Sequence, residues 1–221
     1  MDLHLSPLEA DVSARLSFLI SDELLFQWRA GESMQCKLIS ARDTRRAFAN
    51  IDDDSGWLPS GVVRTGRNSR GSWIVYVAPP QRVRITTDQG EALYIPIPMS
   101  LFLGWGRRYY LYALQGKKFD VNAPVYRAPF PNVYDNGRVC WGSHKVGEVA
   151  PSNIGKTWKL FFGTTFNNHI ASGKTISHED NALDLLRELS AGGKKIFPTG
   201  ELVRQAYSVE SCLNMLLRSA G

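Results

Sequence analysis

The sequence predicts a mixed α+β fold, in which an antiparallel strand meander is flanked by helices and followed by C-terminal helical additions. Two patterns support this prediction. Between residues 57 and 114, short runs rich in β-branched and aromatic residues alternate with turns that contain Gly, Pro or Asp. Beyond residue 150, apolar residues recur instead at helical spacing. The hydrophobic content of 43% is typical of a globular protein.

We expect residues 1–221 to form a single domain made of three regions. The first region, 1–56, carries three strand patterns, at residues 16–20, 24–28 and 35–39. A short helix is expected at 41–50, and Asp52, Asp53 and Asp54 follow it in a solvated turn. These three carboxylates lack the spacing and the distal Glu of a calcium-binding loop.

The second region, 57–172, contains the core. Five strands are expected in an antiparallel meander, at residues 61–65, 73–77, 83–87, 92–97 and 108–114. An extended, irregular path rich in proline follows, and it leads through an active-site loop at 124–142. A helical stripe is then expected, with His169 partly buried on it. The stripe consists of Trp158, Phe161, Phe162, Thr165, Phe166, His169 and Ile170.

The third region, 173–221, is expected to be helical. Ser177 and Asp180 have the spacing of a capping box, in which side chains bond the free N–H groups at the start of a helix. Leucines at helical spacing follow, and Gly192-Gly193 ends that helix. A second apolar stripe begins after Ser208. Both helices are expected to pack on the same domain.

Composition and charge give little support to several classes of function. The net charge of +5 and the pI of about 9.2 are modest, and the basic residues are scattered in pairs such as Arg107-Arg108. Nucleic-acid binding is therefore not indicated, although some basic pairs could meet an acidic surface on a partner. No stretch is long and apolar enough to cross a membrane, and the first residues lack the pattern of a signal peptide. We expect a cytoplasmic location.

The three cysteines do not form a metal-binding or disulfide pattern. Cys36, Cys140 and Cys212 show no CxxC spacing, so no metal site is expected. No phosphate-binding glycine motif is found either, and we expect no bound cofactor. Cys36 and Cys212 lie in patterns typical of structural residues.

Cys140 differs, because it follows a distinctive loop. Residues 130–140 read Phe-Pro-Asn-Val-Tyr-Asp-Asn-Gly-Arg-Val-Cys. Asn136-Gly137 predicts a turn, since both residues tolerate positive φ. Asp135 is expected to accept local backbone hydrogen bonds, and Pro131 restricts Phe130 to extended geometry. A cysteine that carries an acyl group as a thioester needs such a partly exposed loop, which a second protein can approach.

The loop resembles the active-site segment of ubiquitin-conjugating enzymes, in which His-Pro-Asn, a glycine turn and an aliphatic-Cys pair occur in this order. Asn132 precedes Cys140 by eight residues, the spacing of that family, whereas Phe130 stands where the family has His. The arrangement is most similar to the divergent prokaryotic branch, found in bacterial operons with a ubiquitin-like protein, an activating enzyme and a deubiquitinase-like metalloprotease. Some of these operons act in anti-phage defence, and others accompany plasmid-borne clusters.

The resemblance implies a function and roles for the residues of the loop. Cys140 would accept a ubiquitin-like modifier as a thioester from an activating enzyme, which uses ATP, and pass it to an amine of a target protein. Asn132 would stabilise the developing oxyanion or hold the loop in shape. Phe130 would replace the hydrogen bonds of the family's His by packing. Trp141, directly after the thiol, would line the groove for the modifier's tail or pack beneath the loop.

Two alternatives remain open. One is a cysteine hydrolase or acyltransferase that pairs Cys140 with His144 or His169, oriented by Asn167 or Asn168. The other is a non-catalytic module that binds the modifier.

Overall fold

The structure is a computed structural model that describes residues 7–19, 23–44, 56–68 and 70–219. The chain divides into two units, Met1–Gly56 and Trp57–Gly221, at the boundary expected between its first and second regions. The expectation that both units form one domain stays a prediction. No helix within the described ranges is long and apolar enough to cross a membrane.

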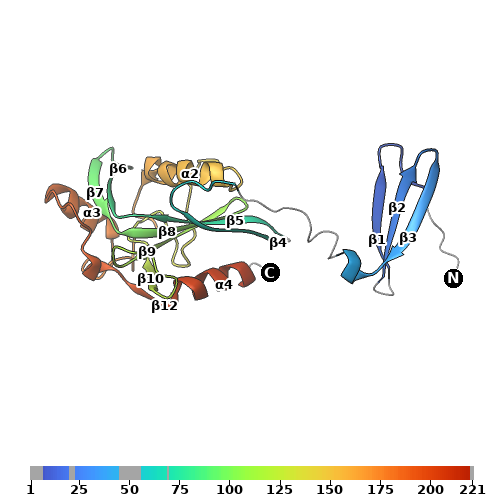
Figure 1. Ribbon diagram of the computed structural model, residues 1–221. Helices are drawn as coiled ribbons and strands as arrows, with labels where there is room; N and C mark the ends of the chain where they lie inside the picture. Colours follow the sequence, from blue (N-terminus) through green and yellow to red (C-terminus); the bar gives the residue numbers. More distant parts are fainter. Residues whose placement is uncertain (1–6, 20–22, 45–55, 69, 220–221) are drawn as a thin grey trace. The chain divides into compact units, whose positions relative to one another are not determined.

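The first unit contains an antiparallel sheet of three strands (Figure 1). In spatial order these are β1 (Ala14–Phe18), β2 (Leu24–Ala30) and β3 (Ser33–Ile39). All three strands were predicted, although β1 begins two residues before its predicted start. The expected helix is seen at 41–44, and the rest of it, like Asp52–Asp54, lies outside the described residues. The prediction that Cys36 is structural was wrong, because β3 is an edge strand whose residues 33–38 are all exposed.

The second unit is built on a six-stranded sheet in the order β12-β10-β9-β8-β5-β4. Its strands are β4 (Val62–Asn68), β5 (Gly71–Ala78), β8 (Met99–Trp105), β9 (Arg108–Leu114), β10 (Pro124–Arg127) and β12 (Arg204–Ser208). The predicted α+β class is confirmed. The sequence analysis missed β8, β10 and β12.

The predicted meander was wrong in its order, because β5 pairs with β8 and not with the strand that follows it. A separate small sheet contains β6 (Gln81–Thr87) and β7 (Ala92–Ile97). Ala78 pairs with Ser100, and Gln81 pairs with Ile97. From the first pair to the second, one strand advances by three residues and the other goes back by three, so the register is continuous. The four strands are thus one long hairpin. Prolines, which cannot donate to the ladder, interrupt it between the pairs: Pro79, Pro80 and Pro98.

Helices cover both faces of the six-stranded sheet (Figure 1). One face packs against α2 (Pro151–Gly163), and the opposite face packs against α4 (Val209–Ser219). The helix α3 (Ala182–Ala191) packs against β7 of the small sheet. Every residue of β8 is consequently buried. A strand covered on both faces has no alternation of apolar and polar residues, which explains why β8 escaped prediction.

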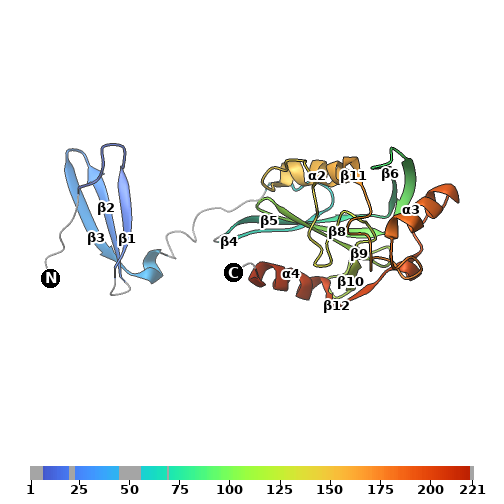
Figure 2. The same ribbon diagram turned by 180° about the vertical axis from the view of Figure 1, so that it is seen from behind.

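Two predicted helix ends were wrong. The aromatic stripe does not continue through Ile170, since α2 ends at Gly163 and is followed by the short strand β11 (Thr165–Phe166), visible beside α2 in Figure 2. β11 pairs in parallel with β6, an interaction that competes with helix extension.

The capping box at Ser177 was also wrong. The N-cap of α3 is Asn181, whose side chain accepts a hydrogen bond from the backbone of Leu183. Ser177 instead donates to Glu201, in the short 3₁₀ helix Thr199–Glu201. The predicted stop at Gly192 and the helix after Ser208 are confirmed.

Candidate active site

The backbone before Cys140 is attached to the edge of β9. β10 pairs only with the second half of this strand, from Tyr112 to Leu114. The first half is bonded by the loop: Val139 N–H donates to the Tyr109 carbonyl at 2.8 Å, and Leu111 N–H donates to the Gly137 carbonyl at 2.7 Å. The segment that ends at Cys140 is therefore held in place by the central sheet.

The predicted turn at Asn136-Gly137 is present. Val133 and Val139 form a β-bridge that closes it. The Arg138 N–H donates to the side-chain oxygen of Asn136 at 3.0 Å, so Asn136 makes the local hydrogen bond that was expected of Asp135. Gly137 has a φ of 82°, a conformation that side chains disfavour.

Phe130 holds the start of the loop by packing, as expected for a residue that replaces a hydrogen-bonding histidine. Its side chain is completely buried. The ring lies edge-on to two rings of α2, with centroid distances of 5.8 Å to Phe161 and 5.6 Å to Phe162. Pro131, also buried, follows it.

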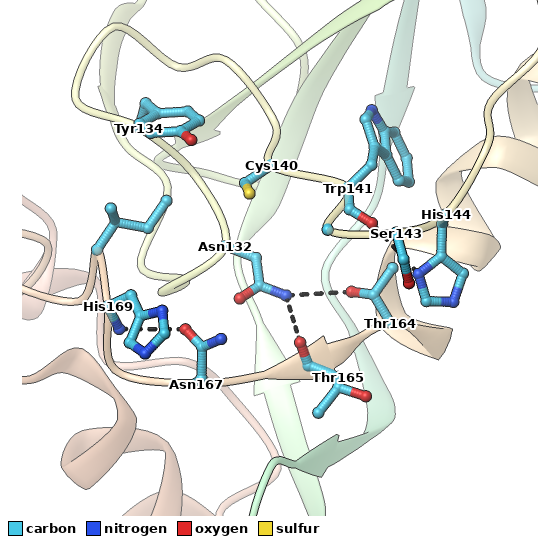
Figure 3. Close-up of a pocket in the computed structure, with 12 residues that line it drawn as sticks. Asn132, Tyr134, Cys140, Trp141, Ser143, His144, Thr164, Thr165, Asn167 and His169 are labelled. Atoms are coloured by element: carbon cyan, nitrogen blue, oxygen red, sulfur yellow. Dashed lines mark hydrogen bonds between the residues drawn. The ribbon is translucent and has the colours of Figure 1, made fainter.

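Asn132 ties the loop to the segment that follows α2. Its side-chain nitrogen donates to Thr164 Oγ1 at 3.1 Å and to the Thr165 carbonyl at 2.9 Å (Figure 3). These bonds use both amide hydrogens, because an amide nitrogen carries only two. The backbone carbonyl of Asn132 also accepts a hydrogen bond from the backbone N–H of Cys140 at 2.8 Å. The geometry thus favours the loop-holding role over direct donation to an oxyanion.

Asp135 supports the loop through a partner distant in sequence. Lys174 Nζ donates to the Asp135 carboxylate at 2.6 Å, and Arg127 lies 3.6 Å from the same oxygen. The Lys174 side chain is only 2% exposed. Burial lowers the pKa of Lys174, and the hydrogen bond from Lys174 lowers the pKa of Asp135. A buried lysine gives no distinctive signal in the sequence, and this partner was not predicted.

The Cys140 thiol is partly exposed and faces Tyr134 across the loop (Figure 3). A hydrogen bond with Cys140 raises the pKa of the Tyr134 hydroxyl, and the charge of the thiolate contributes to the same shift. Tyr134 is itself exposed. The sequence does not reveal this contact, because it depends on the turn.

Trp141 packs beside the thiol as well as bordering a cavity. Its ring is edge-on to Tyr109 at 5.5 Å and to Phe161 at 6.3 Å. The side chain is half-buried and also lines the cavity next to Cys140. The two roles considered for Trp141 are therefore compatible.

This cavity, which we call the thiol pocket, has a volume of about 290 Å³. It brings together residues of the loop and of the segment after α2: Asn132, Tyr134, Cys140, Trp141, Gly142, Ser143, His144, Thr164, Thr165, Asn167, His169 and Ile170. No carboxylate, lysine or arginine is among these described residues. The prediction for His169 was wrong, because it lies on a loop with an exposed side chain.

The histidines do not form a catalytic dyad with the thiol in this structure. The His144 Nδ1 atom lies 3.2 Å from the Trp141 carbonyl. The backbone N–H of His169 donates to the side-chain oxygen of Asn167 at 3.1 Å. This bond does not orient the His169 ring. Among the described residues, neither imidazole is hydrogen-bonded to Cys140. A nucleophile–base pair of a hydrolase would need that bond.

The described residues offer no clustered metal ligands, since no three His, Cys, Asp or Glu side chains among them lie close enough to hold an ion. Cys212 is buried in the core against Tyr112. Burial raises the pKa of Cys212 to about 11, which suits a structural thiol.

Comparison with known families gives one match. The model of prokaryotic E2 family D, a family of the ubiquitin-conjugating class, matches residues 36–205. The match covers most of the chain and includes the whole thiol pocket. No curated protein and no solved structure gives a significant match.

Proposed function

The chain belongs to prokaryotic E2 family D, and from this we propose that Cys140 carries a ubiquitin-like modifier as a thioester. The family supports a role of the ubiquitin-conjugating kind. The observation that carries the specific proposal is the position of Cys140: a partly exposed thiol at the end of a loop anchored to β9, α2 and the segment after α2.

In the loading step, the Cys140 thiolate attacks the carbonyl carbon at the C-terminus of the modifier, which arrives as a thioester of the activating enzyme. The new carbon–sulfur bond forms as the old one breaks, and the thiolate of the activating enzyme leaves. No net change of charge occurs. The Tyr134 hydroxyl, which faces the sulfur, is placed to donate to it while the sulfur is negatively charged.

In the transfer step, an amine of the target attacks the carbonyl carbon of the Cys140 thioester. A carbon–nitrogen bond forms, the carbonyl oxygen becomes transiently negative, and the Cys140 thiolate leaves as the amide is completed. The amine must lose a proton on the way. Because the described lining of the thiol pocket contains no carboxylate, the imidazoles of His144 and His169 are the side chains suited to accept that proton.

His169 is the better placed of the two. His144 already bonds the Trp141 carbonyl through Nδ1, whereas no side-chain bond of His169 is seen within the described part of the chain. His169 also borders a second, smaller cavity of about 150 Å³ that contains Asp135, Ser172 and Lys174. His169 therefore lines both this cavity and the thiol pocket.

The partners proposed are a ubiquitin-like modifier, an activating enzyme and a target protein, in the bacterial cytoplasm. The chain itself would need no cofactor, since ATP is consumed by the activating enzyme. An operon that serves anti-phage defence, or a plasmid-borne cluster, would supply these partners.

A gel assay tests the proposal. The chain is incubated with its activating enzyme, modifier and ATP, and the products are separated with and without reductant. A thioester gives an adduct that reductant removes. A hydrolase would shorten or release the modifier, and a binding module would leave every chain unmodified, so either result would contradict the proposal.

A further inference from the structure

A further hollow lies at the tips of two neighbouring hairpins. It has a volume of about 360 Å³ and is lined by Arg70, Trp105, Gly106, Arg107 and Arg108. Arg70 lies in the turn between β4 and β5, and Arg107 lies in the turn between β8 and β9. These turns are neighbours because β5 pairs with β8. We call this site the arginine hollow.

The arginines of the hollow lack the ion pairs that some other arginines of the same unit make. Arg64, Arg127 and Arg187 each lie within 4.0 Å of a carboxylate. Arg70, Arg107 and Arg108 are exposed, and in the described ranges none of them has such a partner. Three like charges around one hollow repel one another, so the arrangement lacks internal compensation and favours an anion.

The surroundings of the hollow include a buried indole and one acid. The Trp105 side chain is 5% exposed, and within the described structure its indole nitrogen has no hydrogen-bond partner. Glu148 is a nearby acid, with Oε1 3.8 Å from the point where a Cβ of Gly71 would lie. Glu148 forms no ion pair with the three arginines.

The arginine hollow is connected to the segment that leaves Cys140. Gly106 accepts a backbone hydrogen bond from Val149 at 2.7 Å. Tyr109, next to Arg108, contacts the ring of Trp141, which directly follows the thiol. A protein that approaches Cys140 from this side would therefore meet the hollow.

We propose that the arginine hollow docks an acidic segment of the activating enzyme during loading of Cys140. This inference rests on the proposed function. Loading requires two separate proteins to bring their thiols together, and complementary charge accelerates such encounters. The modifier needs no such help after loading, because its covalent bond already confines it. Nucleic acid is a poorer fit, since it requires a basic stripe along several phosphates.

The test compares two triple variants of equal charge. In the first, Arg70→Gln, Arg107→Gln and Arg108→Gln neutralise the hollow. In the control, Lys117→Gln, Lys118→Gln and Lys195→Gln remove three exposed charges elsewhere. Loading rates are measured against the concentration of the charged activating enzyme, at low and high salt, with thermal unfolding of each variant. Arg107→Gln alone, in an exposed turn, is the fallback if the triple variant unfolds.

We expect the hollow variant to raise KM about tenfold at low salt with kcat unchanged. High salt should reduce the difference, and the control should stay close to wild type. An unchanged KM, or an equal rise in the control, would overturn the inference while the wild-type thioester still upheld the proposed function. Absence of any wild-type thioester would refute both. Tight binding of duplex DNA lost only in the hollow variant, with KM unchanged, would assign the hollow to nucleic acid.

Discussion

The hydroxyl of Tyr112 donates a 2.6 Å hydrogen bond to the backbone carbonyl of Asn136, four residues before Cys140. Tyr112 belongs to β9, in the core of the sheet, and its ring also lies against Gly137. A Cβ added to Gly137 would lie 2.3 Å from the Tyr112 ring. The turn before Cys140 therefore rests directly on the central sheet.

Gly137→Ala should consequently destabilise the protein more than a matched change at Gly90. Both glycines have positive φ, 82° and 81°, but Gly90 has open space around it. Strain alone predicts a loss of about 1 kcal/mol for Gly90→Ala, and the clash raises the loss to about 3 kcal/mol for Gly137→Ala. Urea unfolding measures both values. Equal losses of stability would show that the Tyr112 ring moves away from the added methyl group at little cost in free energy.

The sequence predicted much of the fold because most of its strands carry their own signals. β9 was predicted with its observed limits, since aromatic residues and a Gly-Lys-Lys turn mark it. The pairing of β5 with β8 was not accessible in this way. Three prolines break one hairpin into two sheets, and β8 is buried on both faces. Neither effect could be recognised from the pattern of a single strand.

Asn132→Ala tests the role of the amide. Because both amide hydrogens are bonded to Thr164 and Thr165, we expect a loss of stability of about 1–3 kcal/mol. Loading and transfer should slow together. Thr164→Val, which removes one of the two acceptors, is the control and should cause a smaller loss. A transfer rate reduced about 10²-fold with unchanged melting temperature and loading would instead assign Asn132 to the oxyanion.

Asp135→Asn and Lys174→Met test the bridge beside the loop. Asp135→Asn leaves the buried ammonium of Lys174 without its counter-charge, which should cost about 1–3 kcal/mol. Lys174→Met removes the buried charge and should cost less, since Asp135 is exposed and retains Arg127. Thermal unfolding at neutral pH compares the two. A larger loss for Lys174→Met would contradict this order.

The same bridge predicts how the comparison depends on pH. Lys174 lowers the pKa of Asp135 in the folded protein. The stability that the bridge contributes is therefore present above the pKa of an unfolded Asp, about 3.9, and is lost as the pH falls through the pKa of the folded state. The difference in stability between wild type and Asp135→Asn should therefore shrink below about pH 4. A difference that stays constant down to pH 2 would exclude the bridge as its cause.

His169→Gln tests the proposed proton acceptor. We expect transfer to a free amine to slow by about 10²-fold, with loading unchanged, because only the transfer step releases an amine proton. His144→Gln is the matched control in the same pocket and should transfer at nearly the wild-type rate. An equal effect of both changes, or no effect of His169→Gln, would remove this role.

The site was predictable only in its contiguous part. Phe130, Asn132, Gly137 and Cys140 lie within eleven residues, and their order alone indicated the chemistry proposed here. Lys174 and Thr164 lie far away in sequence, and only the chain path brings them to the loop. His169 was misplaced on a helix because the aromatic pattern continues past Gly163, where pairing of β11 with β6 ends the helix.

The most direct test of the central claim is the charging of Cys140→Ser, measured beside Cys36→Ser and Cys212→Ser. Each variant is incubated with activating enzyme, modifier and ATP, and adducts are located by mass spectrometry with and without reductant. The account predicts that Cys140→Ser forms no adduct that reductant removes, although a slower oxyester is permitted. Both other variants should charge through Cys140. A reductant-sensitive adduct on Cys140→Ser at the wild-type level would contradict the account.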